Sequence, residues 1–299
     1  MKKMKSSKMK NKFSLFNFIV MLVLIVYSLT IIFSIYFVLT TSFKTNRGFT
    51  ENIFGLPTKK IFQNNILPIL KQPIQVDQNG VEVPIKIFPH VFVYTALYTV
   101  GSAFFATAVP CFTAYFAAKF DYKFSKFLVA LVVAVMIIPI VGNIPATMKM
   151  LDTLRINGKF YSLWIMKANF VNMWFLVFYA AFKGVAKDYT EAAQIDGASE
   201  FRVMFQIVLP LVRTTFFTVI LIFFVDLWND YQTPLLFTPG YPTLANIVYE
   251  YAQGTIDKKY VKAVYKMAAC TLMIVPTLVI FVAFRKKLMG NLTMGGIKG

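Results

Sequence analysis

Charged residues are scarce in this sequence: 15% of its 299 residues are Asp, Glu, Lys or Arg, and 58% are hydrophobic. Soluble globular domains carry about 25% charged residues. From Phe13 to Phe43 there is no charged residue at all, and roughly 20 apolar residues suffice for a helix to cross a bilayer. The composition excludes a water-soluble domain and a disordered chain, and it predicts an integral membrane protein.

Cysteine and histidine are also rare, which argues against a metal centre and against nucleophilic catalysis. Cys111 and Cys270 lie in apolar stretches, where cysteine packs as a small hydrophobic residue, and His90 is the only histidine. No phosphate-binding loop of the Gly-x4-Gly-Lys-Ser/Thr type is present, because the nearest run, 290–295, is followed by Gly296 and Ile297. We therefore expect no enzyme activity, no catalytic residues, no metal and no cofactor in this chain.

Acidic residues are outnumbered by basic ones, 13 to 31, so the net charge is +18. The cations lie between apolar stretches, so contacts with lipid headgroups explain them better than nucleic acid does, and no nucleic-acid partner is expected. Six lysines within residues 1–12 precede an apolar stretch too long for a cleaved signal peptide. Residues 1–12 are predicted to be a cytoplasmic basic tail, with both termini on the cytoplasmic side.

The apolar stretches predict an all-α fold with six transmembrane helices, at about 13–41, 90–118, 127–148, 160–182, 211–236 and 263–284. Pro139 and Pro145 are expected to kink the outer half of the third. The segment 44–88 is rich in proline and contains the turn signal Asp77-Gln78-Asn79-Gly80, so it is expected to be a folded external loop. The predicted organisation is a tail (1–12), a first helix (13–43), this loop (44–88), a five-helix core (89–285) with a polar loop at 185–210, and a cytoplasmic tail (286–299).

The polar loop carries a distinctive spacing of small, acidic and apolar residues. It reads Glu191-Ala192-Ala193, then Gly197, then Ile207-Val208-Leu209-Pro210. Glu191 lies early in a predicted helix, where the helix dipole favours an anion, and Gly197 lies where the helix would end in the left-handed conformation. The pattern alone leaves two interpretations open: a helix that docks into a groove of a soluble partner, and an amphipathic helix that lies on the membrane.

This spacing, Glu-Ala-Ala-x3-Gly-x9-Ile-x-Leu-Pro, resembles the EAA loop of permease subunits of ABC importers. The run Trp228-Asn229-Asp230 and the closing residues 290–299 are similar to the MalG-like subunits of the carbohydrate-uptake branch. The resemblance covers roughly residues 15–299. It implies the six-helix fold of type I ABC importer permeases and a place in the plasma membrane of a bacterium.

The resemblance also implies partners and roles. The chain would form half of a permease heterodimer with a second homologous subunit. Two copies of an ABC ATPase, which bind ATP and Mg, would lie on the cytoplasmic side of this heterodimer, and a solute-binding protein would dock on its extracellular side. The implied substrate is a carbohydrate, most simply an oligosaccharide. The residues implied for ATPase coupling are Glu191, Ala192, Ala193, Asp196 and Gly197. Those implied to support the coupling helix are Phe201, Ile207, Leu209 and Pro210.

A second group of candidates lies late in the fifth apolar stretch: Asp226, Trp228, Asn229, Asp230 and Tyr231. A carboxylate exposed to lipid is costly, so these residues are predicted either to line a polar translocation pathway, or to cap the helix and pair with Lys167 or a partner subunit. Lys167 itself is expected to reach out to the membrane surface.

Two alternatives to carbohydrate import stay open at this point. The first is a permease of the same superfamily with a non-sugar substrate, since segments 94–99 and 154–158 depart from the family's usual pattern and the loop 44–88 is longer than usual. The second is a stand-alone secondary transporter or channel, which predicts ion-coupling carboxylates within the membrane and repeated halves.

Overall fold

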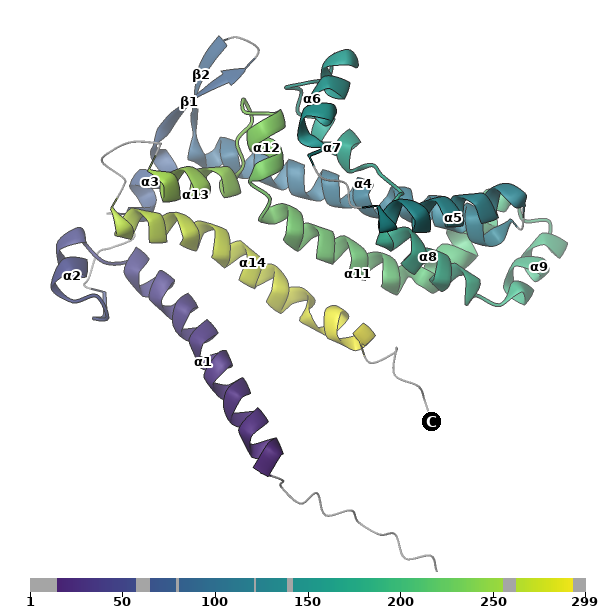
Figure 1. The fold of residues 1–299 in the computed structure, drawn as a ribbon, viewed down its shortest axis with the longest axis horizontal. Coiled ribbons are helices and arrows are strands. Elements are labelled where there is room, and N and C mark those ends of the chain that lie inside the picture. Colours follow the sequence, from purple (N-terminus) through teal and green to yellow (C-terminus); the bar gives the residue numbers. More distant parts are fainter. Residues whose placement is uncertain are drawn as a thin grey trace, which may run out of the picture.

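The computed structural model describes residues 15–57, 65–78, 81–120, 122–138, 142–254 and 262–292, with side chains described up to residue 284. The predictions for the tail 1–12 and for the last seven residues lie outside this part of the chain. Helices dominate the described residues, and Figure 1 shows a few long helices with shorter ones gathered around their ends.

Four helices of the described chain are long and apolar enough to cross a membrane. They span Leu15–Ser42, Ile87–Lys119, Glu200–Trp228 and Ala263–Phe284. The first is α1 (Leu15–Ser42), and the second joins a π-helical turn, η2 (Ile87–Val91), to α4 (Phe92–Lys119). The third joins α10 (Glu200–Arg202), a π-helical segment η3 (Val203–Val208) and α11 (Leu209–Trp228), and the fourth belongs to α14 (Ala263–Leu292).

The third predicted helix is divided in two on either side of residues 139–141, which lie outside the described residues and include Pro139, one of the two prolines expected to kink it. The prediction of one helix at 160–182 was wrong, because two helices lie there. The observed helices are α5 (Lys123–Ile137), α6 (Ile144–Thr153), α7 (Ser162–Lys167) and α8 (Met173–Lys183). Pro145 lies in the first turn of α6, where its missing N–H costs nothing. Asn172 caps α8, because its side chain accepts from the backbone N–H of Trp174 at 2.9 Å, and this fixes a helix start inside the apolar stretch.

The fifth helix also ends earlier than predicted. α11 stops at Trp228 rather than near 236, and a separate helix, α12 (Gln232–Phe237), follows after a corner at 229–231. Further along lies α13 (Leu244–Gln253), which packs against α14. At the other end of α11, Pro210 lies in its first turn as predicted, but the helical path already begins at Glu200.

The loop 44–88 is folded, as predicted, although it adds strands to the expected all-α fold. It contains α2 (Asn46–Glu51), α3 (Leu67–Lys71) and an antiparallel hairpin of β1 (Pro73–Gln78) and β2 (Val81–Lys86). Asp77 and Gln78 of the predicted turn signal pair with Glu82 and Val81 at the end of the hairpin, and Asn79 and Gly80 lie outside the described residues. The Asn65 side chain donates to the carbonyls of Ser42 and Lys44, which secures the loop to the end of α1.

α4 is the central helix of the fold and packs closely against both α8 and α11. Its buried face carries small residues such as Ser102, Ala106 and Ala114, which let neighbouring helix backbones approach. α1 lies at the edge of the molecule, where its last turns contact α14 and the rest of the helix diverges from it (Figure 1). We call the end of the molecule with β1, β2, α12 and α13 the hairpin end. The opposite end, with α9 (Lys187–Ile195), is the α9 end.

Candidate functional site

The α9 segment begins and ends as its sequence predicts. Gly197 has φ 78° just after the helix, which confirms the expected left-handed residue, and nothing lies within 4 Å of where its Cβ would be. Backbone freedom rather than space therefore requires glycine here. The Ala198 N–H donates to the Ala193 carbonyl at 2.9 Å, which closes the turn. Ser199 then starts α10 by accepting from the backbone N–H of Arg202.

One small residue attaches α9 to the rest of the fold. Ala193 is buried against Val203, Met204 and Val208 of η3, so α9 lies close to the start of the long helix that continues through α11. Gln194 adds a hydrogen bond from its amide nitrogen to Glu200 Oε1 at 2.6 Å. A larger side chain at 193 would push the two helices apart.

Most other residues of the segment are exposed. Glu191, Ala192 and Asp196 are all exposed, and Ile195 is 87% exposed at the end of α9. Phe201, predicted to support the helix, is 71% exposed, so that prediction was wrong: the support comes from Val203, Met204 and Val208. The predicted supporting residues Ile207 and Leu209 are partly buried against this cluster, and Pro210 is exposed.

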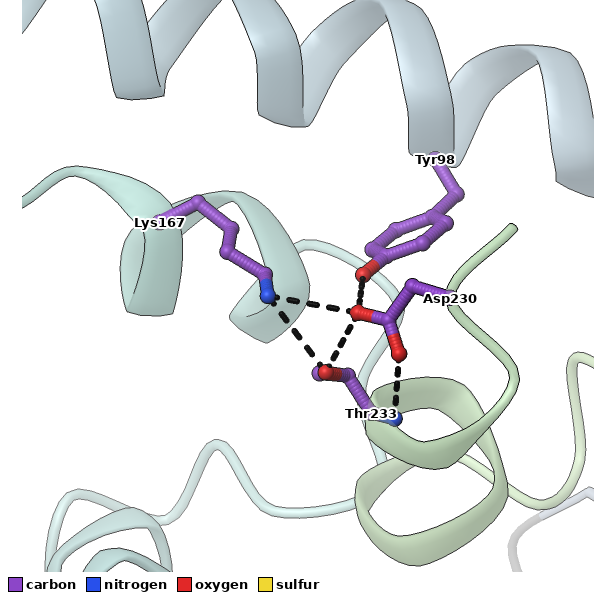
Figure 2. A network of polar contacts seen from close by, with 4 residues as sticks. All are labelled: Tyr98, Lys167, Asp230 and Thr233. Atoms are coloured by element: carbon purple, nitrogen blue, oxygen red, sulfur yellow. Dashed lines mark hydrogen bonds and ion pairs between the residues drawn. The ribbon is translucent and has the colours of Figure 1, made fainter. Parts of the chain in front are cut away.

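A polar network lies at the opposite, hairpin end. Figure 2 shows Asp230, in the corner between α11 and α12, surrounded by three side chains. Its Oδ2 accepts from the hydroxyls of Tyr98 and Thr233, each at 2.6 Å, and lies 3.3 Å from Lys167 Nζ. Its Oδ1 accepts from the backbone N–H of Thr233 at 3.0 Å. The network thus joins α4, α7 and the start of α12.

The surroundings of Asp230 favour its charged form. Burial alone would raise the pKa of this carboxyl, but the Lys167 ammonium and the hydrogen bonds from Thr233 and Tyr98 outweigh it and hold the pKa below its usual range. Lys167 is 29% exposed and pairs inside the protein, so the expectation that it reaches the membrane surface was wrong. For Asp230, the alternative of internal pairing with Lys167 is the one observed.

The other candidate pathway residues do not share one surface with Asp230. Trp228 is buried, and its indole N–H donates to the Met273 carbonyl of α14 at 3.2 Å. Tyr231 stacks on Tyr249 of α13, with ring centroids 4.4 Å apart. Asp226 and Asn229 are exposed, and each lines a separate, largely apolar hollow against α14. The hollow at Asp226 is also lined by Phe281, and the hollow at Asn229 by Met273.

Sequence reasoning missed two members of the network, Tyr98 and Thr233. Tyr98 lies within an apolar stretch and is 132 residues from Asp230, so no local pattern connects them. Thr233 had a usable signal, because an Asp three residues before it at the start of a short helix is a common capping arrangement.

Comparison with known proteins settles which family this arrangement represents. The sequence profile described as "Binding-protein-dependent transport system inner membrane component" matches residues 110–289, which is more than half of the chain and includes α9. The chain belongs to this family. As a member, it is a multi-pass membrane permease of the ABC importer type, and the stand-alone secondary transporter is excluded.

Individual relatives of this permease agree with the family. It is 28% identical over 282 residues, 92% of this chain and 94% of the relative, to the "Probable starch degradation products transport system permease protein AmyC" of Thermoanaerobacterium thermosulfurigenes. It is also 28% identical over 211 residues, 70% and 75% of the two chains, to the "Melibiose/raffinose/stachyose import permease protein MelC" of Bacillus subtilis. Both relatives are transport permeases rather than enzymes.

A solved structure confirms the predicted type I permease fold. A chain from the "Crystal structure of a bacterial ABC transporter involved in the import of the acidic polysaccharide alginate" matches with a TM-score of 0.77 at 17% identity. The match covers 93% of this chain and 98% of the other.

Proposed function

We propose that this permease imports a carbohydrate, most simply an oligosaccharide, and that its α9 segment couples it to an ABC ATPase. The relatives' names support the substrate class, because they refer to melibiose, raffinose and stachyose and to starch degradation products. The ATPase, not this chain, would bind ATP and Mg. A second homologous permease subunit, two ATPase copies and an extracellular solute-binding protein would complete the importer in a bacterial plasma membrane.

The observation that carries the coupling role is the exposed surface of the α9 segment. Ile195 is more exposed than a large apolar residue normally is, and Glu191 and Asp196 flank it without a hydrogen bond or ion pair from their side chains within the described chain. An apolar side chain between two free carboxylates suits a groove of a soluble partner with basic residues at its rim. Docking there would place the α9 end in the cytoplasm.

The long helix 200–228 offers a path from this surface to the opposite end. It begins next to α9, which is attached through Ala193, and it ends two residues before Asp230. Motion of α9 driven by the ATPase would therefore be passed along one continuous helix to the corner that the Lys167–Asp230 network holds. The hairpin end, with the loop from 238 onward, would then face the solute-binding protein.

Coupling is tested with the reconstituted importer in proteoliposomes, by measuring ATP-driven uptake and ATP hydrolysis together. Glu191→Ala should leave the complex inserted but reduce uptake at least tenfold, since one charged contact with the ATPase would be lost. Asp188→Ala removes the same charge from α9 one turn earlier and serves as the matched control. Normal uptake by Glu191→Ala would contradict the coupling role.

Substrate class is tested separately, through the solute-binding protein encoded with this chain. Titration with α-galactosides, maltodextrins, amino acids and peptides should give a calorimetric response with the sugars. Binding of an amino acid or peptide instead would contradict carbohydrate import while leaving the coupling role intact.

A further inference from the structure

A hollow at the α9 end collects cations from three different helices. Lys119 is the last residue of α4, Lys183 the last of α8 and Lys187 the first of α9, and all three line this hollow. Within the described residues, none of the three forms an ion pair with a carboxylate. Among the lining residues only Glu191 is acidic, so the hollow keeps a net positive charge.

A buried hydroxyl without a partner lines the same hollow. Tyr115 of α4 is 3% exposed, and its hydroxyl has no hydrogen-bond partner in the described chain. Its ring is fixed edge-on against Phe182 of α8, with centroids 5.5 Å apart. A buried hydroxyl without a partner is costly, so its presence beside three ammonium groups that have no carboxylate partner in the described chain points to a ligand with acceptor oxygens. Lys183 Nζ also lies over the Tyr179 ring, 5.7 Å from its centroid, which leaves its N–H groups able to donate.

The hollow also has an apolar part, formed by Phe182, Val185 and Val208 next to the lysines. Lys119 and Lys183 close two helices that belong to the apolar body of the protein, so the hollow lies where membrane and water meet. Basic hollows between helices at this depth suit the phosphate of a lipid headgroup, with the glycerol and first acyl carbons on the apolar side.

We propose that this hollow binds a phosphate group, supplied by the headgroup of an anionic membrane lipid. Lys119 and Lys183 hold it from the ends of the helix bundle, Lys187 holds it from α9, and the Tyr115 hydroxyl donates to one of its oxygens. Free inorganic phosphate has the same chemistry, and the experiment below separates the two sources.

The bound headgroup would strengthen the attachment of α9 to the bundle, which otherwise depends on Ala193 and the Gln194–Glu200 hydrogen bond. If α9 couples the permease to its ATPase, transport will depend on anionic lipid. That consequence depends on the proposed function, whereas lipid binding itself does not, so failure of one is distinguishable from failure of the other.

The test is native mass spectrometry of the intact importer, delipidated in detergent and titrated with phosphatidylglycerol. Phosphatidylcholine with the same acyl chains and inorganic phosphate are the comparison ligands. Lys119→Gln/Lys183→Gln should weaken phosphatidylglycerol binding about tenfold or more, since each lysine near the surface adds substantially to the attraction. Lys123→Gln/Lys126→Gln, which removes two lysines from the start of the neighbouring α5, is the matched control and should bind as the wild type does.

Tyr115→Phe gives a second, milder test that does not risk misfolding. Because the hydroxyl has no partner among the described residues, its removal should leave thermal stability unchanged or raised, yet weaken phosphatidylglycerol binding several-fold.

The outcomes show whether the hollow binds phosphate at all and, if it does, whether a lipid or free phosphate supplies it. Saturable phosphatidylglycerol binding that millimolar phosphate does not displace supports the lipid source. Binding of phosphate alone, lost in Lys119→Gln/Lys183→Gln, supports the site with a free anion. Equal phosphatidylglycerol binding by this variant, the control and the wild type would overturn the proposal, as would equal affinity for phosphatidylcholine.

Discussion

The two ends of the molecule treat their charged side chains in opposite ways. At the hairpin end, Asp230 meets Tyr98, Lys167 and Thr233, and all these contacts lie within the chain. At the α9 end, the side chains of Glu191 and Asp196 are exposed and make no such contact with any residue that the structure describes. Charged side chains that pair within the chain stabilise the packing of its own elements. Charged side chains that are exposed and unpaired are available to bind other molecules.

The largest effect is expected where the charges are paired. Asp230→Ala would leave Lys167 without its partner and remove the hydrogen bonds that begin α12, so unfolding should become easier by about 3 kcal/mol. Thermal unfolding of the purified complex in detergent measures this. Asp226→Ala is the matched control, because Asp226 is an exposed aspartate four residues earlier, in the last turn of α11, and its effect should stay within about 0.5 kcal/mol. Similar losses in both variants would contradict the structural role of the network.

Gly101 and Gly197 are needed for different reasons, close packing at the first and a left-handed backbone at the second, so alanine at each should cost a different amount of stability. A Cβ at Gly101 would collide with the indole of Trp164, whose N–H donates to the Leu97 carbonyl, so Gly101→Ala should cost about 2 kcal/mol. A Cβ at Gly197 would meet nothing, so Gly197→Ala should cost only about 1 kcal/mol, from its left-handed backbone. Thermal unfolding of both variants checks the order, and a larger loss at 197 would contradict it.

The pH dependence of stability should report on Asp230. Because its pKa is lower in the folded protein than usual, the stabilisation is fully present above the ordinary Asp pKa of about 3.9, and it is lost as pH falls through the lower folded value. The difference in unfolding temperature between the wild type and Asp230→Asn should therefore be largest at neutral pH and narrow below about pH 4. A difference that stays constant over this range would show that the charge of Asp230 does not contribute.

The smallest effect on stability is expected at the α9 end. Ile195→Ser should change the unfolding free energy by less than about 0.5 kcal/mol, because the side chain touches little of its own chain. Uptake driven by ATP should nevertheless fall several-fold in proteoliposomes, and Ile195→Leu should restore it. Normal uptake by Ile195→Ser would mean that the exposed side chain is not a contact for the ATPase.

The α9 segment was predictable because its signals are local. Helix formers at 191–193 and a glycine four residues beyond them determine a short helix with a left-handed end. A departure from a straight third helix was predictable from Pro139 and Pro145. The break in the fourth apolar stretch was not, since hydropathy does not reveal that Asn172 caps a new helix. For Asp230, the sequence could not decide between a place in the translocation pathway and internal pairing, because Tyr98 and Lys167 lie 132 and 63 residues away in sequence.

The exposed position of Phe201 shows a further limit of sequence reasoning. An aromatic residue at helical spacing predicts a buried contact, yet the turn that follows Gly197 leaves Phe201 exposed and places the first buried residues two and three positions later, at Val203 and Met204. Such a shift depends on how the turn is closed, which the spacing alone does not determine.

The central claim, that the exposed α9 surface contacts the ATPase, is tested most directly by photo-cross-linking from position 195. A benzophenone amino acid replaces Ile195 in the assembled importer, and Asp226 in a parallel control, and the cross-linked products are identified by mass. The account predicts an adduct between this chain and the ATPase from position 195 and none from position 226. Adducts from position 195 with lipid alone would contradict it and favour an amphipathic helix that lies on the membrane.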